Sequence, residues 1–521
     1  MKRGVLKNMQ ISHKKCGVLF SYATIFANLL VNLFFIPYLI NSVGEADYGI
    51  YKIASSFSSQ LAIINFGIGT VVARGIAKYN VLNDKASKGN FLFMNGIISA
   101  IISAGMLLIG VVMYFSMDIL FQDSLAPVEL VLAKKVFIIS IISTAVSVSK
   151  DLFTGIINGN EKFAVTGFLK IFRIVVRITV MVIMIKLQFG VLSIALAELS
   201  ASVGIIAIES LYALINLKEK IKFTKWNKAE FFEILGFALA LCLQAIVNQV
   251  NMTLDSTILG AVLTEDVGVT VTIYSVALII LSNFGSICDN ISSVFTPQTT
   301  KLVYSNAPVE DLLNLVIKIG RIQMMIGSCL VGLFILFGKE FLNLWMGEDF
   351  EKAYIPAIIL IVPTLIPLVQ SVTNAILDAK GKRMFKSLVL FGSAIINVIL
   401  SVFFIKQIGF VGAAIGTCLS ILIGQGIIMN IYYHKVLKLN IFKMFKGILN
   451  KTLPVFICVT LLFVPVSIYL PYSIPLFAIK CGAYVGILFL ALYFIAMRPN
   501  EKQLFKSVIH ILKRLKSKIK I

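Results

Sequence analysis

Long apolar runs, each about 20 residues in length, recur along almost the whole chain. A helix of that length spans the hydrocarbon core of a bilayer, which is about 30 Å thick. The runs are continuously apolar rather than alternating, which favours helices over barrel strands. The pattern predicts an all-α polytopic membrane protein with about 14 transmembrane helices, near residues 17–40, 50–73, 91–117, 136–157, 164–186, 189–213, 235–262, 271–295, 322–345, 354–377, 385–406, 410–433, 453–472 and 474–497.

Composition supports the membrane class. The 521 residues are 58% hydrophobic and only 14% charged, which is far more apolar than a soluble protein of this size. A basic stretch precedes Cys16, as in a signal peptide, but the following apolar run is longer than an ordinary signal sequence and has no clear small-residue cleavage site. We interpret this run as a retained first helix.

The net charge of +22 is concentrated in loops that fall on one side of the membrane if the helices alternate. The opposite loops carry mainly acids. By the positive-inside rule both termini are cytoplasmic, which requires an even number of helices. This distribution argues against a nucleic-acid partner. The basic clusters lie in residues 2–15, 74–88, 218–228, 380–386, 435–451 and 498–520.

The final residues, 498–521, predict a basic amphipathic helix that lies on the anionic lipids of the inner leaflet. Seven cysteines are scattered within or beside apolar segments, without the spacing of metal ligands, so we interpret them as small core residues. The three histidines fall in basic stretches. The sequence therefore predicts no metal site.

The chain resembles itself at an offset of about 219 residues, so that Gly49 meets Gly268 and Gly190 meets Gly409. The matches share one offset and one topological position, which predicts an internal duplication of six helices. Because six is even, both copies have the same orientation, and we expect two lobes, a cleft and alternating access. The predicted parts are an N-terminal six-helix lobe (1–217), a basic linker (218–230), a C-terminal six-helix lobe (231–434), a basic linker with helices 13 and 14 (435–497) and the tail (498–521).

The most specific chemical signal is a row of cations, Lys170, Arg173 and Arg177, inside the predicted fifth helix. Their spacing places them on one helical face. Cations in hydrocarbon are costly unless they face a wet cavity or acidic partners. Arginine binds phosphate oxygens in a bidentate manner, so the face predicts an anionic cargo. The alternative is structural ion pairing with Glu198 and Glu209, which lie at similar depths on the next helix.

Two acids within predicted spans, Asp255 and Asp289, are candidate proton or sodium sites. The alternative for Asp255 is a structural ion pair with Lys52. For Asp289 the same two interpretations, an ion-coupling site or a structural partner, stay open.

Amides on the first and seventh predicted helices, among them Asn32 and Asn251, are candidates for binding sugar hydroxyls. The alternative is hydrogen bonding between helices. Arg74 ends the second predicted helix at the cytoplasmic mouth, where it either receives cargo or anchors at lipid headgroups.

Three stretches carry a family resemblance: Gly-Glu-Ala-Asp-Tyr-Gly-Ile-Tyr at 44–51, Gly-Ile-Ile-Asn-Gly-Asn-Glu-Lys-Phe at 155–163, and Gly-Phe-Val-Gly-Ala-Ala-Ile-Gly-Thr at 409–417. With the two six-helix lobes and two extra helices, the chain resembles the polysaccharide-export branch of the multidrug/oligosaccharidyl-lipid/polysaccharide (MOP) exporters. The resemblance covers essentially the whole chain.

This resemblance implies a Wzx-type flippase, which serves surface polysaccharides such as O-antigen or capsule. Such a protein moves undecaprenyl-diphosphate-linked oligosaccharide units from the inner to the outer leaflet of the bacterial cytoplasmic membrane. It also implies glycosyltransferases and a polysaccharide polymerase as partners. We expect a monomer without a cofactor. Whether transport is coupled to H⁺ or Na⁺ stays open at this point.

Two alternatives to this function are an enzyme and another exporter of the same superfamily. An enzyme has little support, because the sequence contains no long extramembrane stretch and no nucleotide loop, metal-binding acidic pair or nucleophile arrangement. A cation-coupled multidrug exporter of the same superfamily usually stops at 12 helices, and many carry an acid in the first helix. The segment 17–40 has none. A peptidoglycan-precursor flippase remains compatible with the topology and the cations.

Overall fold

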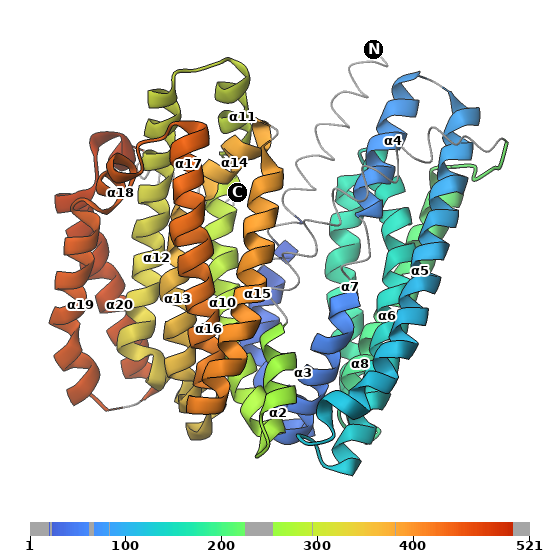
Figure 1. Cartoon of the computed structure of the whole chain (residues 1–521), viewed down its shortest axis with the longest axis horizontal. Helices are drawn as coiled ribbons and strands as arrows, with labels where there is room; N and C mark the ends of the chain where they lie inside the picture. Colours follow the sequence, from blue (N-terminus) through green and yellow to red (C-terminus); the bar gives the residue numbers. More distant parts are fainter. Residues whose placement is uncertain are drawn as a thin grey trace, which may run out of the picture. The chain divides into compact units, whose positions relative to one another are not determined.

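The computed structural model describes residues 20, 23–24, 26–61, 67–82, 84–224, 254–293, 295–380, 382–471 and 473–503. Across these ranges the chain forms helices joined by short turns and contains no strand (Figure 1). The all-α prediction is therefore confirmed. The chain divides into two compact units, Met1–Ser275 with Ile405–Phe410 and Val276–Phe404 with Val411–Ile521. The predicted lobe boundary near 231 lies outside the described residues.

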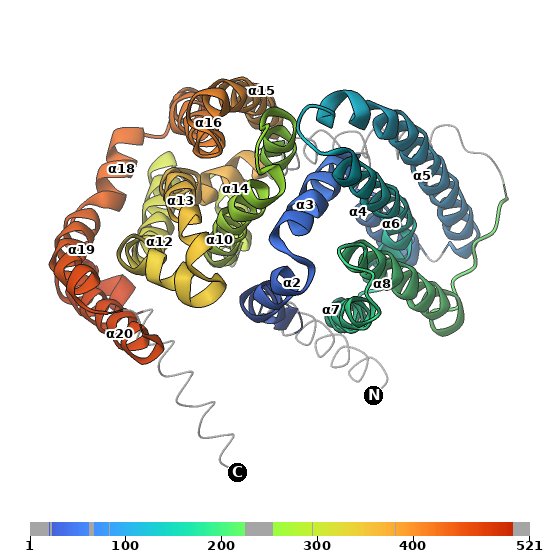
Figure 2. The ribbon, with the colours of Figure 1, turned by 90° about the horizontal axis from the view of Figure 1, so that it is seen from below.

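In the first unit α6 is the central helix. It packs against α3, α4, α5 and α8, and α8 packs in turn against α7 (Figure 2). The described elements of this unit are η1 (Val31–Phe35), α2 (Ile36–Val43), α3 (Glu45–Ser59), α4 (Ile68–Leu82), α5 (Lys85–Phe121), α6 (Pro127–Gly159), α7 (Phe163–Lys186), α8 (Leu192–Leu211), η3 (Tyr212–Asn216) and the first part of α10 (Val267–Ser293).

In the second unit the long helix α12 has the corresponding role, because α13, α18, α19 and α20 all pack against it. After α10, the elements are α11 (Thr296–Tyr304), α12 (Val309–Met346), η4 (Glu348–Ala353), α13 (Tyr354–Val369), α14 (Ser371–Ala379), α15 (Arg383–Ile408), α16 (Val411–Ile421), η5 (Leu422–Ile428), α17 (Met429–Leu437), α18 (Ile441–Leu449), α19 (Thr452–Tyr469), α20 (Ile474–Ala491) and η6 (Leu492–Ala496).

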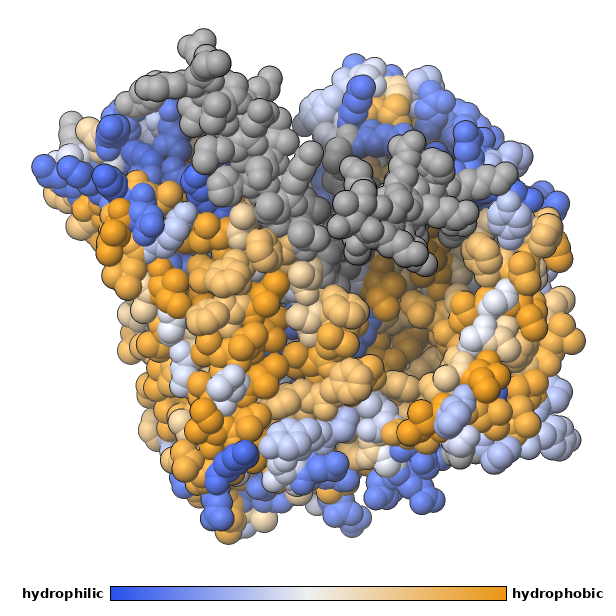
Figure 3. Space-filling model, turned by 180° about the vertical axis from the view of Figure 1, so that it is seen from behind, coloured by the Kyte–Doolittle hydropathy of each residue, from blue (hydrophilic) through white to orange (hydrophobic). Residues whose placement is uncertain are grey.

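Among the described residues, 11 helices are long and apolar enough to cross a membrane. Each coincides with one of the predicted segments. Of the other three, most of 235–262 lies outside the described residues, 164–186 is the cation-bearing α7, and 50–73 is divided between α3 and α4. Figure 3 shows hydrophobic residues over the middle of the visible face, with hydrophilic residues toward its upper and lower edges. The chain is a multi-pass membrane protein.

Two predicted spans are not single helices. In the segment 50–73, α3 ends at Ser59 and α4 begins at Ile68, after Gly67 with φ of 60°, while residues 62–66 lie outside the described ranges. The segment 354–377 is interrupted at Gln370, between α13 and α14. Two prolines inside α13, Pro363 and Pro367, lack the backbone N–H that helical hydrogen bonding uses, which weakens the helix just before this break.

The internal duplication is visible in backbone conformation. Gly190 and Gly409, which the self-comparison pairs, both follow a long helix and both have positive φ, at 56° and 68°. Residues with a Cβ rarely adopt this conformation, so glycine suits both turns. The same backbone conformation thus occurs at corresponding positions of the two repeats.

Candidate functional site

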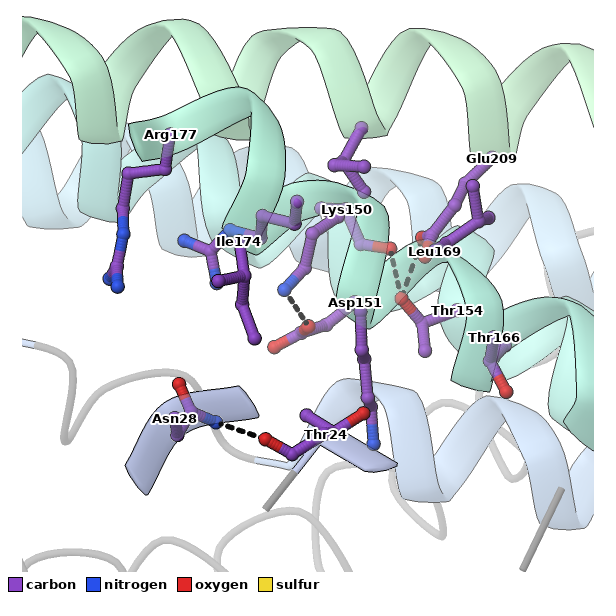
Figure 4. A pocket seen from close by; sticks show the side chains of 13 residues that line it. Thr24, Asn28, Lys150, Asp151, Thr154, Thr166, Leu169, Ile174, Arg177 and Glu209 are labelled. Carbon is purple, nitrogen blue, oxygen red and sulfur yellow. Dashed lines mark hydrogen bonds and ion pairs between the residues drawn. The ribbon is translucent and has the colours of Figure 1, made fainter. Parts of the chain in front are cut away.

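The first unit contains a cavity of about 440 Å³. It lies among α6, α7, α8 and the described part of the first helix, and polar side chains from all four enter it (Figure 4). The polar lining comprises Thr24 and Asn28 from the first helix, Lys150, Asp151 and Thr154 from α6, Thr166, Lys170, Arg173 and Arg177 from α7, and Glu209 from α8.

The cavity wall on α7 follows directly from helical periodicity. Its lining residues recur every three or four positions, which keeps them on one face over about three turns. The cations Lys170, Arg173 and Arg177 all lie on this face. The row of cations recognised in the sequence is therefore one continuous wall of a cavity.

Glu198 on α8 forms ion pairs with both arginines of this wall. Arg173 Nη2 pairs with Oε1 of Glu198, and Arg177 Nη1 lies 3.5 Å from Oε2. Arg173 Nη2 also lies 3.4 Å from the hydroxyl of Ser202. All three charged side chains remain about a third exposed, at 32%, 33% and 33%. One partly exposed carboxylate thus pairs with two guanidinium groups.

This sharing leaves hydrogen-bonding capacity at the cations. In the described part of the chain, the buried Nε atoms of Arg173 and Arg177 have no hydrogen-bond partner. A buried donor without an acceptor is costly, so an oxygen-rich ligand that supplied one would be favoured. Lys170 is exposed to the cavity and forms no ion pair with any described residue.

The opposite wall, on α6, escaped the sequence analysis. Lys150 Nζ lies 3.2 Å from Oδ1 of Asp151, and Thr154 Oγ1 lies 2.6 Å from Oε2 of Glu209. The sequence predicts Glu209 as an ion-pair partner for the cations of α7, whereas in the structure it contacts Thr154. The sequence does contain a signal for this wall, because Lys150 and Asp151 are two charged residues near the end of the apolar segment 136–157.

Other candidates lie away from this cavity. Asp255 is buried and accepts a hydrogen bond from the Tyr274 hydroxyl at 2.6 Å, while Lys52 lies over the ring of Tyr48. Asn32 is half-buried on η1, and Arg74 is exposed on α4. Neither belongs to the cavity lining. Asn251 and the side chain of Asp289 lie outside the described residues.

Membrane-spanning helices around a charged cavity define the class as a multi-pass membrane protein with a polar cavity in its first unit. The profile of the polysaccharide biosynthesis protein family matches residues 15–303, which is more than half of the chain. The protein therefore belongs to that family. No curated protein matches the chain.

Solved structures show the same fold. The lipid II flippase MurJ in its inward closed conformation is 18% identical, with a TM-score of 0.69 over 91% of this chain and 98% of MurJ. An inward-facing multidrug resistance MATE transporter of the MOP superfamily is 17% identical, with a TM-score of 0.62 over 80% of this chain and 99% of that one.

A third similar structure is a MOP superfamily transporter from Pyrococcus furiosus, described as having a binding pocket of reverse polarity. It is 17% identical, with a TM-score of 0.53 over 82% of this chain and 97% of that one. At these identities the likeness establishes the fold only. The resemblance to the MOP exporters is thus confirmed at the level of the fold.

Proposed function

We propose that this protein is a flippase that moves undecaprenyl-diphosphate-linked oligosaccharide units from the inner to the outer leaflet of the bacterial cytoplasmic membrane, for O-antigen or capsule synthesis. The observation that carries the proposal is the cationic wall of α7, where two arginines share one carboxylate inside a membrane-spanning unit. Both termini are cytoplasmic in this proposal, and transport proceeds by alternating access.

The chemistry of a diphosphate fits this wall. Its oxygens supply acceptors for the Nε atoms of Arg173 and Arg177, and guanidinium binds phosphate oxygens in a bidentate manner. Glu198 keeps the empty site from holding two uncompensated cations, and diphosphate competes with it for the same donors. Binding therefore replaces one set of charge-assisted hydrogen bonds with another, which allows release on the other side.

The remaining parts of the cargo have matching surroundings. Thr24, Asn28 and Thr166 offer hydroxyl and amide groups to sugars, and the lipid tail can stay in the bilayer. We extend the proposal to sugar contacts by Asn32 and Asn251 and cargo entry at Arg74. It further includes ion coupling at Asp255 or Asp289, and a monomer that works beside glycosyltransferases and a polymerase.

Peptidoglycan precursor is a second candidate cargo. The observation that favours it is the fold match to a lipid II flippase over 91% of this chain. A diphosphate-linked precursor would meet the same arginines. Export of cationic drugs is less well supported, because the α7 wall would repel them.

The test compares wild type with an Arg173→Ala/Arg177→Ala double variant at matched membrane abundance. One strain lacks its oligosaccharide flippase, and a second is depleted of its lipid II flippase. We expect wild type to rescue the first strain and the double variant to fail. Lys186→Ala is the control, because this α7 residue lies outside the cavity lining.

Rescue of the second strain alone would establish peptidoglycan precursor as the cargo. Full activity of the double variant would reduce both arginines to structural partners of Glu198. Dye export by wild type without rescue of either strain would favour a multidrug exporter instead.

A further inference from the structure

Thr154 stands between two oxygen atoms that belong to different helices. Its Oγ1 lies 3.2 Å from the backbone oxygen of Lys150, one turn earlier on α6, and 2.6 Å from Oε2 of Glu209 on α8. Both distances are within the range of hydrogen bonds between a hydroxyl and an oxygen acceptor. The close-up in Figure 4 shows both contacts meeting at Thr154.

The number of protons constrains this arrangement. A threonine hydroxyl has one proton to donate, and a backbone oxygen can only accept. The hydroxyl donates to Oε2 of Glu209 at 2.6 Å, which is the shorter of its two contacts, and the carboxyl group can accept this bond in either protonation state. The contact with the backbone oxygen of Lys150, at 3.2 Å, is weaker, and both contacts are full hydrogen bonds only if the carboxyl group brings a second proton, as its neutral form does.

The surroundings of Glu209 favour the neutral form. The residue is only 4% exposed, and it forms no ion pair with any lysine or arginine in the described ranges. Burying an ionised carboxylate without a paired cation is expensive. Glu198, on the same helix, is a third exposed and paired with two arginines. Two acids on α8 thus occupy opposite environments.

The charged and titratable groups around Glu209 come from every helix that faces it. Lys150 and Asp151 on α6 form a pair with each other, and Lys170 and Arg173 come from α7. The first helix contributes Thr24 and Asn28, which do not titrate. Tyr212 follows one turn later in the same helical run.

We propose that Glu209 carries a proton in the transport-competent state and thereby sets the charge of the cavity for a doubly negative cargo. Among the described residues, four cations face three acids, counting Glu198, so the site has a charge of +1 when Glu209 is ionised and +2 when it is protonated. A diphosphate esterified at both ends, to lipid and to sugar, has one ionised oxygen on each phosphorus. The protonated site therefore matches its charge.

This inference rests on the proposed function and names a specificity-determining residue within it. The cations are Lys150, Lys170, Arg173 and Arg177. Glu209 contributes no attraction itself. Its proton removes a negative charge that would oppose the second phosphate.

The first experiment examines the proton directly. Infrared difference spectra of the purified full-length protein at neutral pH, wild type against Glu209→Gln, report the carbonyl stretch of a protonated carboxylic acid. We expect this band in wild type and its loss in the variant. Thr154→Val should shift the band, because it removes the hydroxyl partner. Absence of any band assignable to Glu209 overturns the proposal.

The second experiment measures binding of two probes, a farnesyl-diphosphate-linked N-acetylglucosamine with two negative charges and a farnesyl-phosphate-linked sugar with one. If Glu209 is already neutral, Glu209→Gln removes no charge, so the ratio of the affinities for the two probes should stay within about twofold of the wild-type ratio. If Glu209 is ionised, the same variant removes a negative charge and tightens diphosphate binding roughly tenfold or more, which overturns the proposal. Glu198→Gln is the matched control, because it removes a paired, ionised carboxylate and must change affinity.

The two proposals fail differently. A carboxylic acid band at Glu209 without diphosphate binding by wild type refutes the charge match together with the proposed cargo, and leaves only the proton assigned. Diphosphate binding by wild type without the band keeps the proposed function and overturns this inference.

Discussion

Gly49 on α3 and Gly268 on α10, which the self-comparison pairs across the duplication, meet backbone to backbone. A Cβ built at Gly49 would lie 1.7 Å from the backbone oxygen of Gly268, and one at Gly268 would lie 2.5 Å from the backbone oxygen of Ala46. The Thr272 hydroxyl also donates to the backbone oxygen of Glu45 at 2.6 Å. Corresponding positions of the two repeats thus form one close helix contact in the first unit.

Gly49→Ala should therefore destabilise the protein by about 1–3 kcal/mol, because the obstacle is backbone and cannot rotate away. The measurement is thermal unfolding of the purified protein in detergent. The control is Gly204→Ala on α8, where a Cβ meets nothing within 4 Å. That change should stabilise the helix by about 0.5–1 kcal/mol. Equal melting temperatures for the two variants would contradict the close contact.

Arg321 on α12 forms a buried ion pair with Glu501, with Nε 2.7 Å from Oε1 and side chains only 2% and 3% exposed. Its guanidinium also donates to the backbone oxygens of Gly447, Asn450 and Ala496. Arg321→Met should cost about 3–5 kcal/mol of stability, because it leaves Glu501 buried without a cation.

The control for Arg321 is an exposed ion pair between α12 and α18. Lys443 and Glu310 form an ion pair with side chains 54% and 58% exposed. Lys443→Met should change stability by about 1 kcal/mol or less. Unfolding curves that rank the two variants in the opposite order would refute the assignment of Arg321 as a structural anchor.

Lys480 on α20 and Glu340 on α12 form a second buried pair, with Nζ 2.5 Å from Oε2. Lys480→Met should cost about 3–5 kcal/mol, and adding Glu340→Met should recover much of that loss, because the stranded charge is gone. A double-mutant cycle on unfolding in detergent measures the coupling. Additive single effects would show that the two charges do not interact.

Lys170→Ala should weaken diphosphate binding roughly tenfold, equivalent to about 1.4 kcal/mol, because an exposed ammonium group is removed from the cavity wall. Lys186→Ala on the same helix should leave binding unchanged. Isothermal titration calorimetry with the diphosphate-linked probe measures the affinity of each variant. Protein stability should hold in both variants, since neither lysine has an ion pair among the described residues. Equal affinities would remove Lys170 from the binding wall.

Much of the fold was predictable because the signals are local. The length and continuity of an apolar run determine whether a helix can cross a bilayer, and the period of 3.6 residues places Lys170, Arg173 and Arg177 on one face. The same reasoning overlooked the breaks at Gly67 and Gln370, since a continuous apolar run does not register a local change of backbone conformation.

The sequence by itself determined the membrane class, the helical spans and the cationic face of α7, because each depends on neighbours along one helix. The tertiary structure decided which distant groups meet. Glu198 serves both arginines, Thr154 contacts Glu209, and Arg321 reaches Glu501. Such pairings depend on the packing of separate helices at particular rotations and depths, and that information does not reside in any single apolar segment.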